Sequence, residues 1–299
     1  MKIFITGSSG FIGTRLVKYI LKNFKNTDVC TFDLTEGDDI RNEFQLSKAM
    51  ELFRPDVVVH LAALAGVRRG EEYPEEYYST NILGTENVFK CAKKHGVGKV
   101  ISFSSSSVFG IDGYPCSVYG ISKHAAEHIA KKYSKQNMEN LDTLHSIFVV
   151  RPFTVYGENG RNDQVIRKWI GQILKGDNIS FYGNGDSFRP YTYVEDLVQS
   201  VCKMINTNEK GYLDFHVYGI TKVSLTELLN TFERLCKNWG IRFGIERLPK
   251  HDVDPMGNDP ELYETNGNPL IDCRSTTDFY AKVKSILKAE LYKPWKQNH

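Results

Sequence analysis

The chain has 299 residues, enough for one large α/β domain or for such a domain with a smaller appendage. Its formal net charge of +2, without any block of lysines and arginines, argues against nucleic acid as a partner. No apolar run approaches the roughly 20 residues of a membrane-spanning helix, and the first apolar run is too short for a signal peptide, so we expect a cytoplasmic protein with no membrane partner.

The first half of the chain alternates stretches typical of strands and of helices. The strand-like stretches are apolar on both faces, as in a sheet that is covered on each side. Strands are expected at 2–7, 28–33, 55–63, 98–105 and 144–153, and helices at 11–24, 44–53, about 75–95 and 117–133. This alternation predicts an α/β fold with a doubly wound parallel sheet, the Rossmann architecture.

Beyond about residue 152 the alternation loosens, and Gly, Asn and Asp become frequent. Helical patterns recur near 163–175, 194–205, 224–238 and 276–289. We expect residues 1–152 to form the main domain, with later segments near 178–217 joining its core, and residues 153–299 to form mainly a smaller C-terminal α/β subdomain for the substrate. Six scattered cysteines without a C-x-x-C pair predict neither a metal site nor a disulfide framework.

A glycine-rich turn follows the first expected strand. The stretch TGSSGFIG places Gly7, Gly10 and Gly13 between that strand and a helix. Such glycines allow a tight turn, a close approach of the backbone to a pyrophosphate, and helix packing on the strand. The first N–H groups of the helix then hold the phosphates. The turn predicts a dinucleotide-binding site.

An acidic residue, Asp33, ends the second expected strand, twenty residues beyond Gly13. A carboxylate at this place accepts hydrogen bonds from the adenosine ribose and repels a 2′-phosphate. Its neighbours Phe32 and Leu34 provide no arginine to hold such a phosphate, so NAD is favoured over NADP. The alternative is that Asp33 is only a solvated residue at a strand end.

A Tyr-x-x-x-Lys pair, Tyr119 and Lys123, lies on the helix that follows the serine-rich end of the fourth expected strand. Residues four apart share a helix face, and a nearby ammonium together with the positive nicotinamide could lower the pKa of a tyrosine enough for it to act as a base. The same spacing recurs at Tyr218/Lys222, Tyr280/Lys284 and Tyr292/Lys296. Those pairs lack this setting and are interpreted as surface or packing residues.

Eight stretches together carry a resemblance to a known family. The chain resembles the extended short-chain dehydrogenases/reductases, in particular the NAD-dependent nucleotide-sugar epimerase/dehydratase family and, within it, the UDP-glucose and UDP-glucuronate 4-epimerases. The stretches, in the family's order and within residues 1–240, are TGSSGFIG, DDIRN, HLAALAGVR, YYSTNILGTENV, FSSSSVFG, YGISK, RPFTVYG and FRPYTYVEDL.

The resemblance implies NAD as cofactor and a set of residues that bind it. Gly7, Gly10, Phe11, Ile12 and Gly13 would hold the pyrophosphate, Asp33 the adenosine ribose, and Asp39 and Ile40 the adenine. The remaining cofactor contacts implied are Leu34, Leu61, Ala62, Ala63, Asn81, Ser104, Tyr119, Lys123 and Phe153.

The resemblance also implies catalytic and substrate-binding residues. Tyr119 would be the base, Lys123 its partner and Ser105 the hydroxyl of the triad. Phe153 and Thr154 would face the sugar, with Thr154 near a C6 carboxylate, although it could simply cap a strand end. The other substrate contacts would be Ser105 and Ser106, Tyr182 on the nucleotide base, Arg189 on the diphosphate, and Arg68 and Arg161 on anionic groups.

The residues after Ser105 favour epimerisation over dehydration. Dehydratases of the family carry Asp-Glu directly after the catalytic hydroxyl, whereas this chain has Ser106 and Ser107. We therefore expect a nucleotide-sugar 4-epimerase that forms a homodimer and prefers a UDP-sugar. The alternatives are an NAD-dependent reductase or dehydrogenase of a 4-keto sugar and a non-catalytic binding protein.

The resemblance has departures. The connection from Ser105 to Tyr119 is short for the family, which predicts an open sugar site or another covering element. A second diphosphate arginine has no clear counterpart, and Met256 stands near its place.

Overall fold

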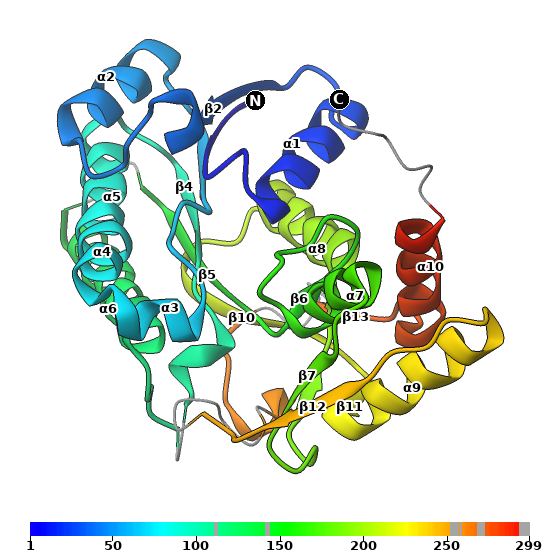
Figure 1. The fold of residues 1–299 in the computed structure, drawn as a ribbon. Coiled ribbons are helices and arrows are strands. Elements are labelled where there is room, and N and C mark those ends of the chain that lie inside the picture. The colour runs from blue at the N-terminus through cyan, green and yellow to red at the C-terminus, as the bar shows by residue number, and fades with distance from the viewer. Residues whose placement is uncertain (111–112, 141–143, 252–256, 258, 268–272, 293–299) are drawn as a thin grey trace.

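A computed structural model describes residues 1–110, 113–140, 144–251, 257, 259–267 and 273–292 of the chain (Figure 1). Met256 and Lys296 lie outside these residues. The central element is a seven-stranded sheet in the order β13-β10-β5-β4-β3-β1-β2, and every pairing in it is parallel. The expected doubly wound sheet is confirmed. Its strands are β1 (Lys2–Thr6), β2 (Asp28–Phe32), β3 (Val57–His60), β4 (Lys99–Phe103), β5 (Ser146–Pro152), β10 (Gly211–Gly219) and β13 (Arg274–Ser275).

Successive residues of these strands point to opposite faces of the sheet, as the strand period of two requires. In β1, Ile3 and Ile5 join one core and Phe4 the other; in β3, Val58 takes the opposite side from Val57 and Val59. Both sets are fully or almost fully buried. The continuous apolar strands of the sequence therefore reflect burial on both faces.

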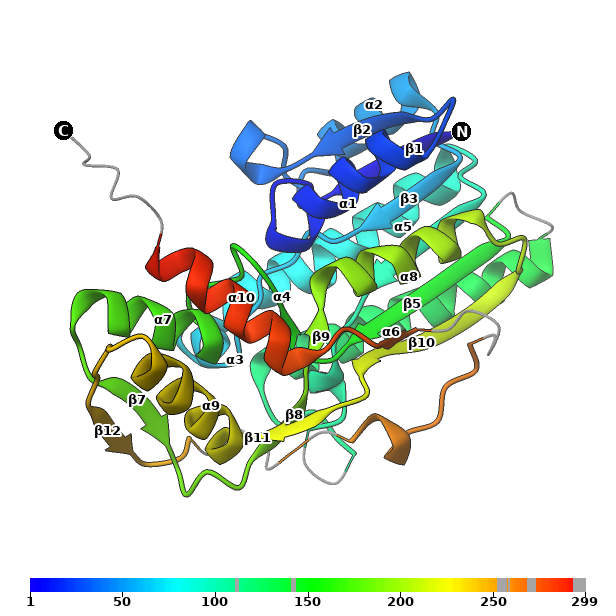
Figure 2. The ribbon, with the colours of Figure 1, turned by 90° about the vertical axis from the view of Figure 1, so that its right-hand side faces the viewer.

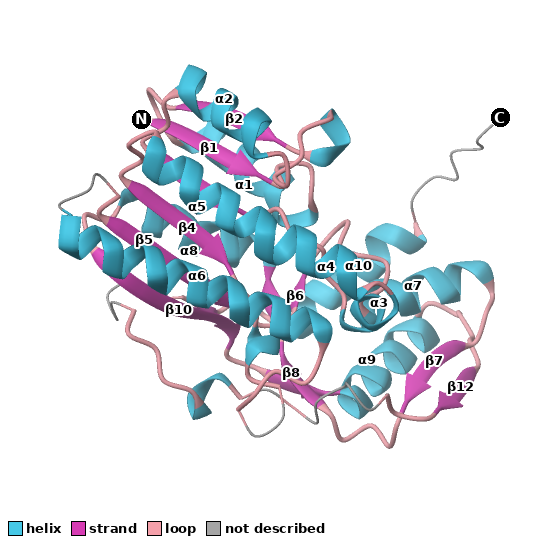
Figure 3. Ribbon diagram, turned by 90° about the vertical axis from the view of Figure 1, so that its left-hand side faces the viewer, coloured by secondary structure: helices cyan, strands magenta, loops and turns pink. Residues whose placement is uncertain are grey.

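Helices cover each face of the sheet (Figures 1 and 3). On one side α1 packs against α8; on the other, α2 packs on α5 and α5 on α6. These helices are α1 (Phe11–Asn23), α2 (Glu43–Phe53), α5 (Gly84–Lys94), α6 (Val118–Asn140) and α8 (Val194–Asn206).

The helix expected over about 75–95 is built from three consecutive pieces. These are α4 (Pro74–Tyr78), a π-helical segment (Ser79–Leu83) and α5. The π segment shifts the register between the two α-helical parts and contains the fully buried Asn81. The short helix α3 (Val67–Glu72) precedes them and packs on α6.

The later part of the chain supplies both the main sheet and a smaller subdomain (Figure 2). Strands β10 and β13 belong to the main sheet, and helix α8 packs on it. The main domain therefore contains segments from both sides of residue 152. The segment 179–182 pairs with 245–248 in a separate two-stranded sheet, and its residues Ile179 and Phe181 belong to the same buried cluster as Ile3 of the main sheet. The remaining elements are α7 (Val165–Lys175), α9 (Leu225–Asn238), α10 (Phe279–Leu291), β6 (Val155–Tyr156), β7 (Ile179–Tyr182), β8 (Phe188–Pro190), β9 (Thr192–Tyr193), β11 (Lys222–Ser224) and β12 (Ile245–Leu248), with 3-10 turns at Leu34–Glu36, Ser106–Val108 and Pro260–Leu262.

The described part of the chain contains no helix that is both long and apolar enough to cross a membrane. The same residues include no group of three or more His, Cys, Asp or Glu side chains that could hold a metal ion.

Candidate active site

An opening lined by many of the predicted site residues lies at the carboxyl ends of the central strands. Strand β2 lies on one side of β1 and β3 on the other, so the strand order reverses at β1. Doubly wound folds bind their ligands at this kind of reversal. Two adjoining cavities of about 420 and 590 Å³ open at this edge and share lining residues from both parts of the molecule. The shared residues are Gly66, Val67, Thr154, Asp163, Gln164 and Arg189.

The phosphate turn lines the smaller cavity and has no space for larger residues. Gly7 has a φ of +72°, and a Cβ on it would lie 2.6 Å from the backbone nitrogen of Ala62. A Cβ on Gly13 would lie 2.2 Å from the carbonyl oxygen of Gly7. Gly10 is the N-cap of α1 and has no side chain to cap the helix. The first N–H groups of α1 therefore suit a phosphate, and the turn fits a dinucleotide.

Asp33 connects this turn to the loop after β2. Its carboxylate accepts hydrogen bonds from the backbone nitrogens of Ser9 (2.9 Å) and Thr35 (3.0 Å) and from the Thr35 hydroxyl (2.8 Å). Leu34, next to it, is largely exposed. These contacts place Asp33 directly beside the phosphate turn, as an adenosine ribose ligand requires.

The two residues predicted at the adenine, Asp39 and Ile40, differ in burial and charge: the first is ion-paired at the surface and the second is buried. The Asp39 carboxylate is held by the Arg41 guanidinium at 2.6 Å, and hydrogen bonding to Arg41 lowers the pKa of Asp39. Ile40 is buried and leaves no space for a Cβ on Gly84 of α5.

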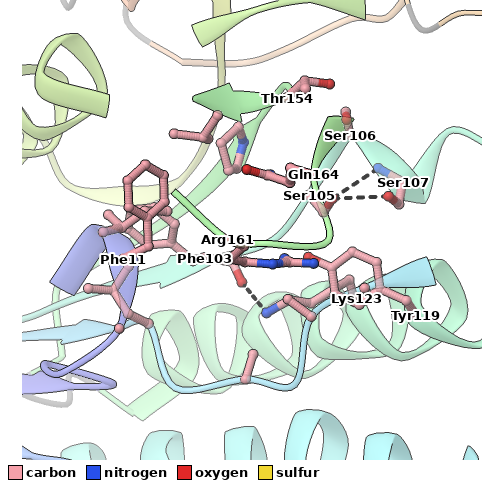
Figure 4. A pocket seen from close by; sticks show the side chains of 18 of the residues that line it. Phe11, Phe103, Ser105, Ser106, Ser107, Tyr119, Lys123, Thr154, Arg161 and Gln164 are labelled. Atoms are coloured by element: carbon pink, nitrogen blue, oxygen red, sulfur yellow. Dashed lines mark hydrogen bonds between the residues drawn. The ribbon is translucent and has the colours of Figure 1, made fainter. Parts of the chain in front are cut away.

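The serine-rich end of β4 forms one wall of the smaller cavity (Figure 4). Ser105 caps the following 3-10 turn: its hydroxyl accepts from the Ser107 nitrogen at 3.1 Å and donates to the Ser107 hydroxyl at 3.2 Å. Ser106 lines the same wall, and the Ser104 hydroxyl donates to Glu127 at 2.6 Å. The turn aims the Ser105 hydroxyl at the space in front of α6.

Tyr119 and Lys123 come from the first turns of α6 and line the same cavity. Lys123 is almost fully buried, and its Nζ donates to the carbonyl oxygen of Phe103 at 2.7 Å, marked by a dashed line in Figure 4. Burial lowers the pKa of Lys123 to about 8, although the charge of Glu127 opposes this shift. Lys123 is thus anchored to the strand that bears the serines.

The pKa of Tyr119 is subject to opposing influences. Burial raises it, while a hydrogen bond with Ser105 and the positive charge of Arg161 lower it. Arg161 is thus a cation beside the phenol that the sequence prediction, which named Lys123, did not include, and the Lys123 ammonium donates to Phe103. Arg161 in turn pairs with Asp163.

The larger cavity is rich in positive charge. Arg68 lies 4.1 Å from the ring centre of Tyr182, and Lys168 lies 4.9 Å from it and donates to the tyrosine hydroxyl at 3.2 Å. Arg189 lines both cavities, and Arg69 and Lys250 line the larger one. Five basic side chains around one cavity suit a diphosphate.

Two residues expected to contact the cofactor, Asn81 and Phe153, have fully buried side chains, and a third, Ala62, is partly buried. Ala62 packs against the buried cluster that contains Phe4 of β1 and Val58 of β3. The Asn81 amide bonds both backbone groups of Leu64 and the hydroxyl of Ser122, so it fixes the loop after β3 against α6. Phe153 is fully buried in an aromatic cluster with Phe109, although its neighbour Thr154 lines the cavity.

Sequence reasoning missed several lining residues. Gln164 and Asp163, in the loop before α7, and Val67, at the start of α3, border both cavities. Asp163 could have been suspected from its position two residues after Arg161, but Gln164 and Val67 reach the site only through the folding of distant segments.

The fold and the site define a dinucleotide-binding α/β protein that carries a serine, a tyrosine and a lysine suited to nicotinamide-dependent alcohol oxidation. The chain belongs to the NAD dependent epimerase/dehydratase family, whose sequence profile matches residues 3–220. The resemblance read from the sequence is confirmed, as are an enzyme of this family and NAD as its cofactor.

Relatives within the family have different reactions. The chain is 32% identical to a GDP-6-deoxy-D-talose 4-dehydrogenase of Aggregatibacter actinomycetemcomitans, over 98% of this chain and 97% of that protein. It is 30% identical to a UDP-glucuronate 4-epimerase of Thermodesulfobacterium geofontis, over 77% of this chain and 79% of that protein. A crystal structure of UDP-glucuronic acid 4-epimerase from Bacillus cereus, in complex with UDP-glucuronic acid and NAD, superposes with a TM-score of 0.83 at 26% identity, covering 98% of this chain and all (100%) of that one.

Proposed function

We propose that the protein is a nucleotide-sugar 4-epimerase that acts on a UDP-hexuronate or UDP-hexose and keeps NAD bound throughout turnover. One observation carries the choice of reaction. Among the described residues that line the cavity around Tyr119, Asp163 is the single carboxylate, and it is ion-paired with Arg161. Elimination of water needs an additional acid and base at the sugar, and Ser106 and Ser107 cannot serve as either.

The chain's residues divide the proton chemistry between them. Tyr119 takes the proton of the sugar 4-hydroxyl and later returns it, and Ser105 orients that hydroxyl. Lys123 holds α6 against the end of β4 through its hydrogen bond to the Phe103 carbonyl oxygen, and it would reach the nicotinamide ribose. When bound, NAD accepts a hydride from carbon 4 of the sugar and gives it back. Because the two faces of the sugar must be presented in turn, the 4-keto sugar must rotate within the cavity.

Positive charge in the cavity around Tyr119 supports a hexuronate as the substrate. Arg161 lies within electrostatic range of Tyr119, and Thr154 and Ser106 line the same cavity. A guanidinium and two hydroxyls suit a carboxylate. The adjoining cavity offers the diphosphate three basic side chains, those of Arg189, Arg68 and Lys168. Tyr182 in the same cavity would pack on the nucleotide base. The UDP-glucuronate 4-epimerase relatives agree with this preference.

A second candidate function is an NAD-dependent dehydrogenase of a nucleotide sugar at carbon 4. The relative that carries this reaction is 32% identical over nearly the whole chain. The same serine, tyrosine and lysine would serve it, and the difference would lie in whether the keto sugar leaves before it is reduced again.

Incubation with a panel of nucleotide sugars separates these functions. UDP-glucuronate, UDP-glucose and a GDP-6-deoxyhexose are each mixed with the purified protein, and products are identified by NMR while NADH absorbance is recorded. We expect the carbon-4 epimer of UDP-glucuronate and no net NADH. A 4-keto product with stoichiometric NADH would establish the dehydrogenase instead.

A matched pair of variants tests the catalytic assignment. Tyr119→Phe is expected to lower kcat by about 100-fold or more, because the proton acceptor is lost, with bound NAD retained. Tyr280→Phe alters the tyrosine of another Tyr-x-x-x-Lys pair, on α10, and is expected to leave turnover unchanged. Normal turnover by Tyr119→Phe contradicts the assignment.

A homodimer remains a prediction from the family resemblance. The helices at about 75–95 and 119–135 form a dimeric four-helix bundle in related enzymes, and the corresponding segments, α5 and α6, pack together here. A monomer in light scattering at micromolar concentration would remove the prediction. A cytoplasmic location likewise remains a prediction.

A further inference from the structure

A buried ion pair lies next to Ser104, behind the serine-rich end of β4 that lines the smaller cavity. The Arg151 guanidinium, on β5, contacts the Glu127 carboxylate, on α6, through two hydrogen bonds of 2.8 Å, and both side chains are almost fully buried, with 7% and 4% exposed. A buried charge without its partner is strongly unfavourable, so the two groups stabilise each other. Nothing in the proton chemistry described above uses this pair.

The pair extends to β10 and keeps defined charges. Arg151 also contacts Asp214 at 3.2 Å and the Nε2 atom of His216 at 3.3 Å. Burial opposes the charge of Arg151, but hydrogen bonding and the charges of Glu127 and Asp214 raise its pKa overall. Burial and the charge of Arg151 lower the pKa of His216 to about 4, so His216 is neutral near pH 7.

Glu127 is connected to the catalytic serine through Ser104. The Ser104 hydroxyl donates to Glu127 at 2.6 Å, and the Ser104 backbone nitrogen donates to the carbonyl oxygen of Val150 at 2.7 Å. Ser105 is the next residue, so its position depends on both contacts. The carboxylate thereby joins the strand end that bears Ser105 to the helix that bears Tyr119.

Glu127 also stands one helical turn beyond Lys123 on the same face of α6. Its charge raises the pKa of Lys123, against the burial that lowers it to about 8. His60, on β3, is a titratable group on another element that interacts with the charge of Lys123. Burial and the charge of Lys123 lower the pKa of His60 to about 3, so His60 contributes no charge near neutral pH.

We propose that Glu127 is a positioning residue for the reaction: its carboxylate, held by Arg151, fixes Ser104 and the adjacent Ser105 against α6 and places a negative charge beside the Lys123 ammonium. The role in turnover rests on the proposed function. The arrangement itself, and its effect on Lys123, can be measured without a substrate.

The variant Glu127→Gln keeps the shape of the side chain and removes its charge. It is expected to lower kcat by about tenfold or more, because the serine hydroxyl is no longer fixed, with KM changed little and NAD still bound. Loss of the negative charge lowers the pKa of Lys123, so the fall of activity on the alkaline side should begin at a lower pH. A wild-type kcat and a wild-type pH profile would overturn the proposal.

Three further variants separate the contributions. Glu127→Asp keeps the charge but shortens the reach, so kcat should fall while the alkaline limb stays near its wild-type position. Ser104→Ala keeps the ion pair and should lower kcat severalfold, and it decides the positioning role if Glu127→Gln does not fold: an unchanged kcat overturns that role. Glu43→Gln removes the exposed ion pair with Lys90 and should change neither quantity.

A measurement without substrate distinguishes failure of this proposal from failure of the proposed function. Lysine residues are labelled with ¹³C at the ε carbon, and the Lys123 signal is assigned by its absence in Lys123→Met. In Glu127→Gln this signal should titrate at a lower pH than in the wild type. An unchanged midpoint overturns the electrostatic part even if the substrate is still unknown, whereas a shifted midpoint in a protein that turns over no nucleotide sugar contradicts the proposed function alone.

Discussion

The Arg161 guanidinium lies close enough to Tyr119 for its positive charge to lower the pKa of the phenol, against the burial that raises it (Figure 4). The two residues come from different parts of the chain, the loop before α7 and the first turn of α6. Arg161 therefore acts in two ways in our account: it favours the phenolate and it offers a partner for a carboxylate of the sugar.

Replacing Arg161 by Ala should change both the pH profile and substrate binding. Without the cation the pKa of Tyr119 rises, and since the phenolate exists only above that pKa, the acidic limb of the kcat profile should move to higher pH. KM for UDP-glucuronate should rise by about tenfold or more, because a charged hydrogen bond is worth roughly 1.5–3 kcal/mol. Steady-state kinetics over a pH series measure both quantities.

The control is Arg242→Ala, which removes an exposed arginine in the loop between α9 and β12. It should leave the acidic limb of the kcat profile and the KM for UDP-glucuronate unchanged. If Arg161→Ala keeps the wild-type acidic limb, Arg161 does not influence the base.

Gly13→Ala should abolish stable NAD binding. The new Cβ would lie 2.2 Å from the carbonyl oxygen of Gly7 and 2.8 Å from Ser8, so the turn must open and its N–H groups leave the pyrophosphate. The NAD released from purified, denatured protein measures the effect, with near-stoichiometric NAD in the wild type and little in the variant.

Gly171→Ala is the matched control, because Gly171 lies inside α7 with no atom within 4 Å of an added Cβ. Alanine there should stabilise the helix by up to about 1 kcal/mol and leave the NAD content unchanged. Equal NAD content in both variants would show that the turn does not hold the pyrophosphate.

Lys99→Met should destabilise the fold without altering the site. The Lys99 ammonium donates to three carbonyls at the end of α8, those of Met204, Ile205 and Thr207, at 2.6–2.9 Å. Methionine fills similar space but leaves these acceptors without a donor, so the free energy of unfolding should fall by about 2 kcal/mol.

Denaturant unfolding, with kcat measured in parallel, checks this outcome. Lys18→Met replaces an exposed lysine on α1 and should change stability little. An unchanged unfolding free energy for Lys99→Met would mean that these bonds are not stabilising.

The parts of the site that sequence could predict depend on local pattern. Gly7 and Gly13 are dictated by one turn, and Tyr119 and Lys123 by one helix face, so their grouping at the cavity follows from spacing and strand order. The parallel sheet was predictable for the same reason, because each βα unit carries its own periodicity.

The parts that sequence could not predict depend on contacts between distant segments. Glu127, Arg151 and Asp214 are three ordinary charged residues in sequence, and only the packing of α6, β5 and β10 brings them together. Likewise Phe109, in the connection after Ser105, is covered by a later segment, since it stacks on Tyr263 with ring centres 3.8 Å apart.

The roles expected for Asn81 and Phe153 illustrate the same limit. Family resemblance placed both at the cofactor, whereas their side chains are fully buried and bonded or packed within the fold. A residue's position in a motif does not reveal whether its side chain turns toward the cavity or away from it.

The most direct test of the account uses UDP-glucuronate that carries deuterium at carbon 4, incubated with the protein and its bound NAD in ordinary water. If Tyr119 moves only the hydroxyl proton and the bound cofactor returns the hydride that it received, the carbon-4 epimer should retain the deuterium, without net NADH. Loss of the deuterium to water, or a 4-keto product with stoichiometric NADH, would contradict the proposed epimerisation.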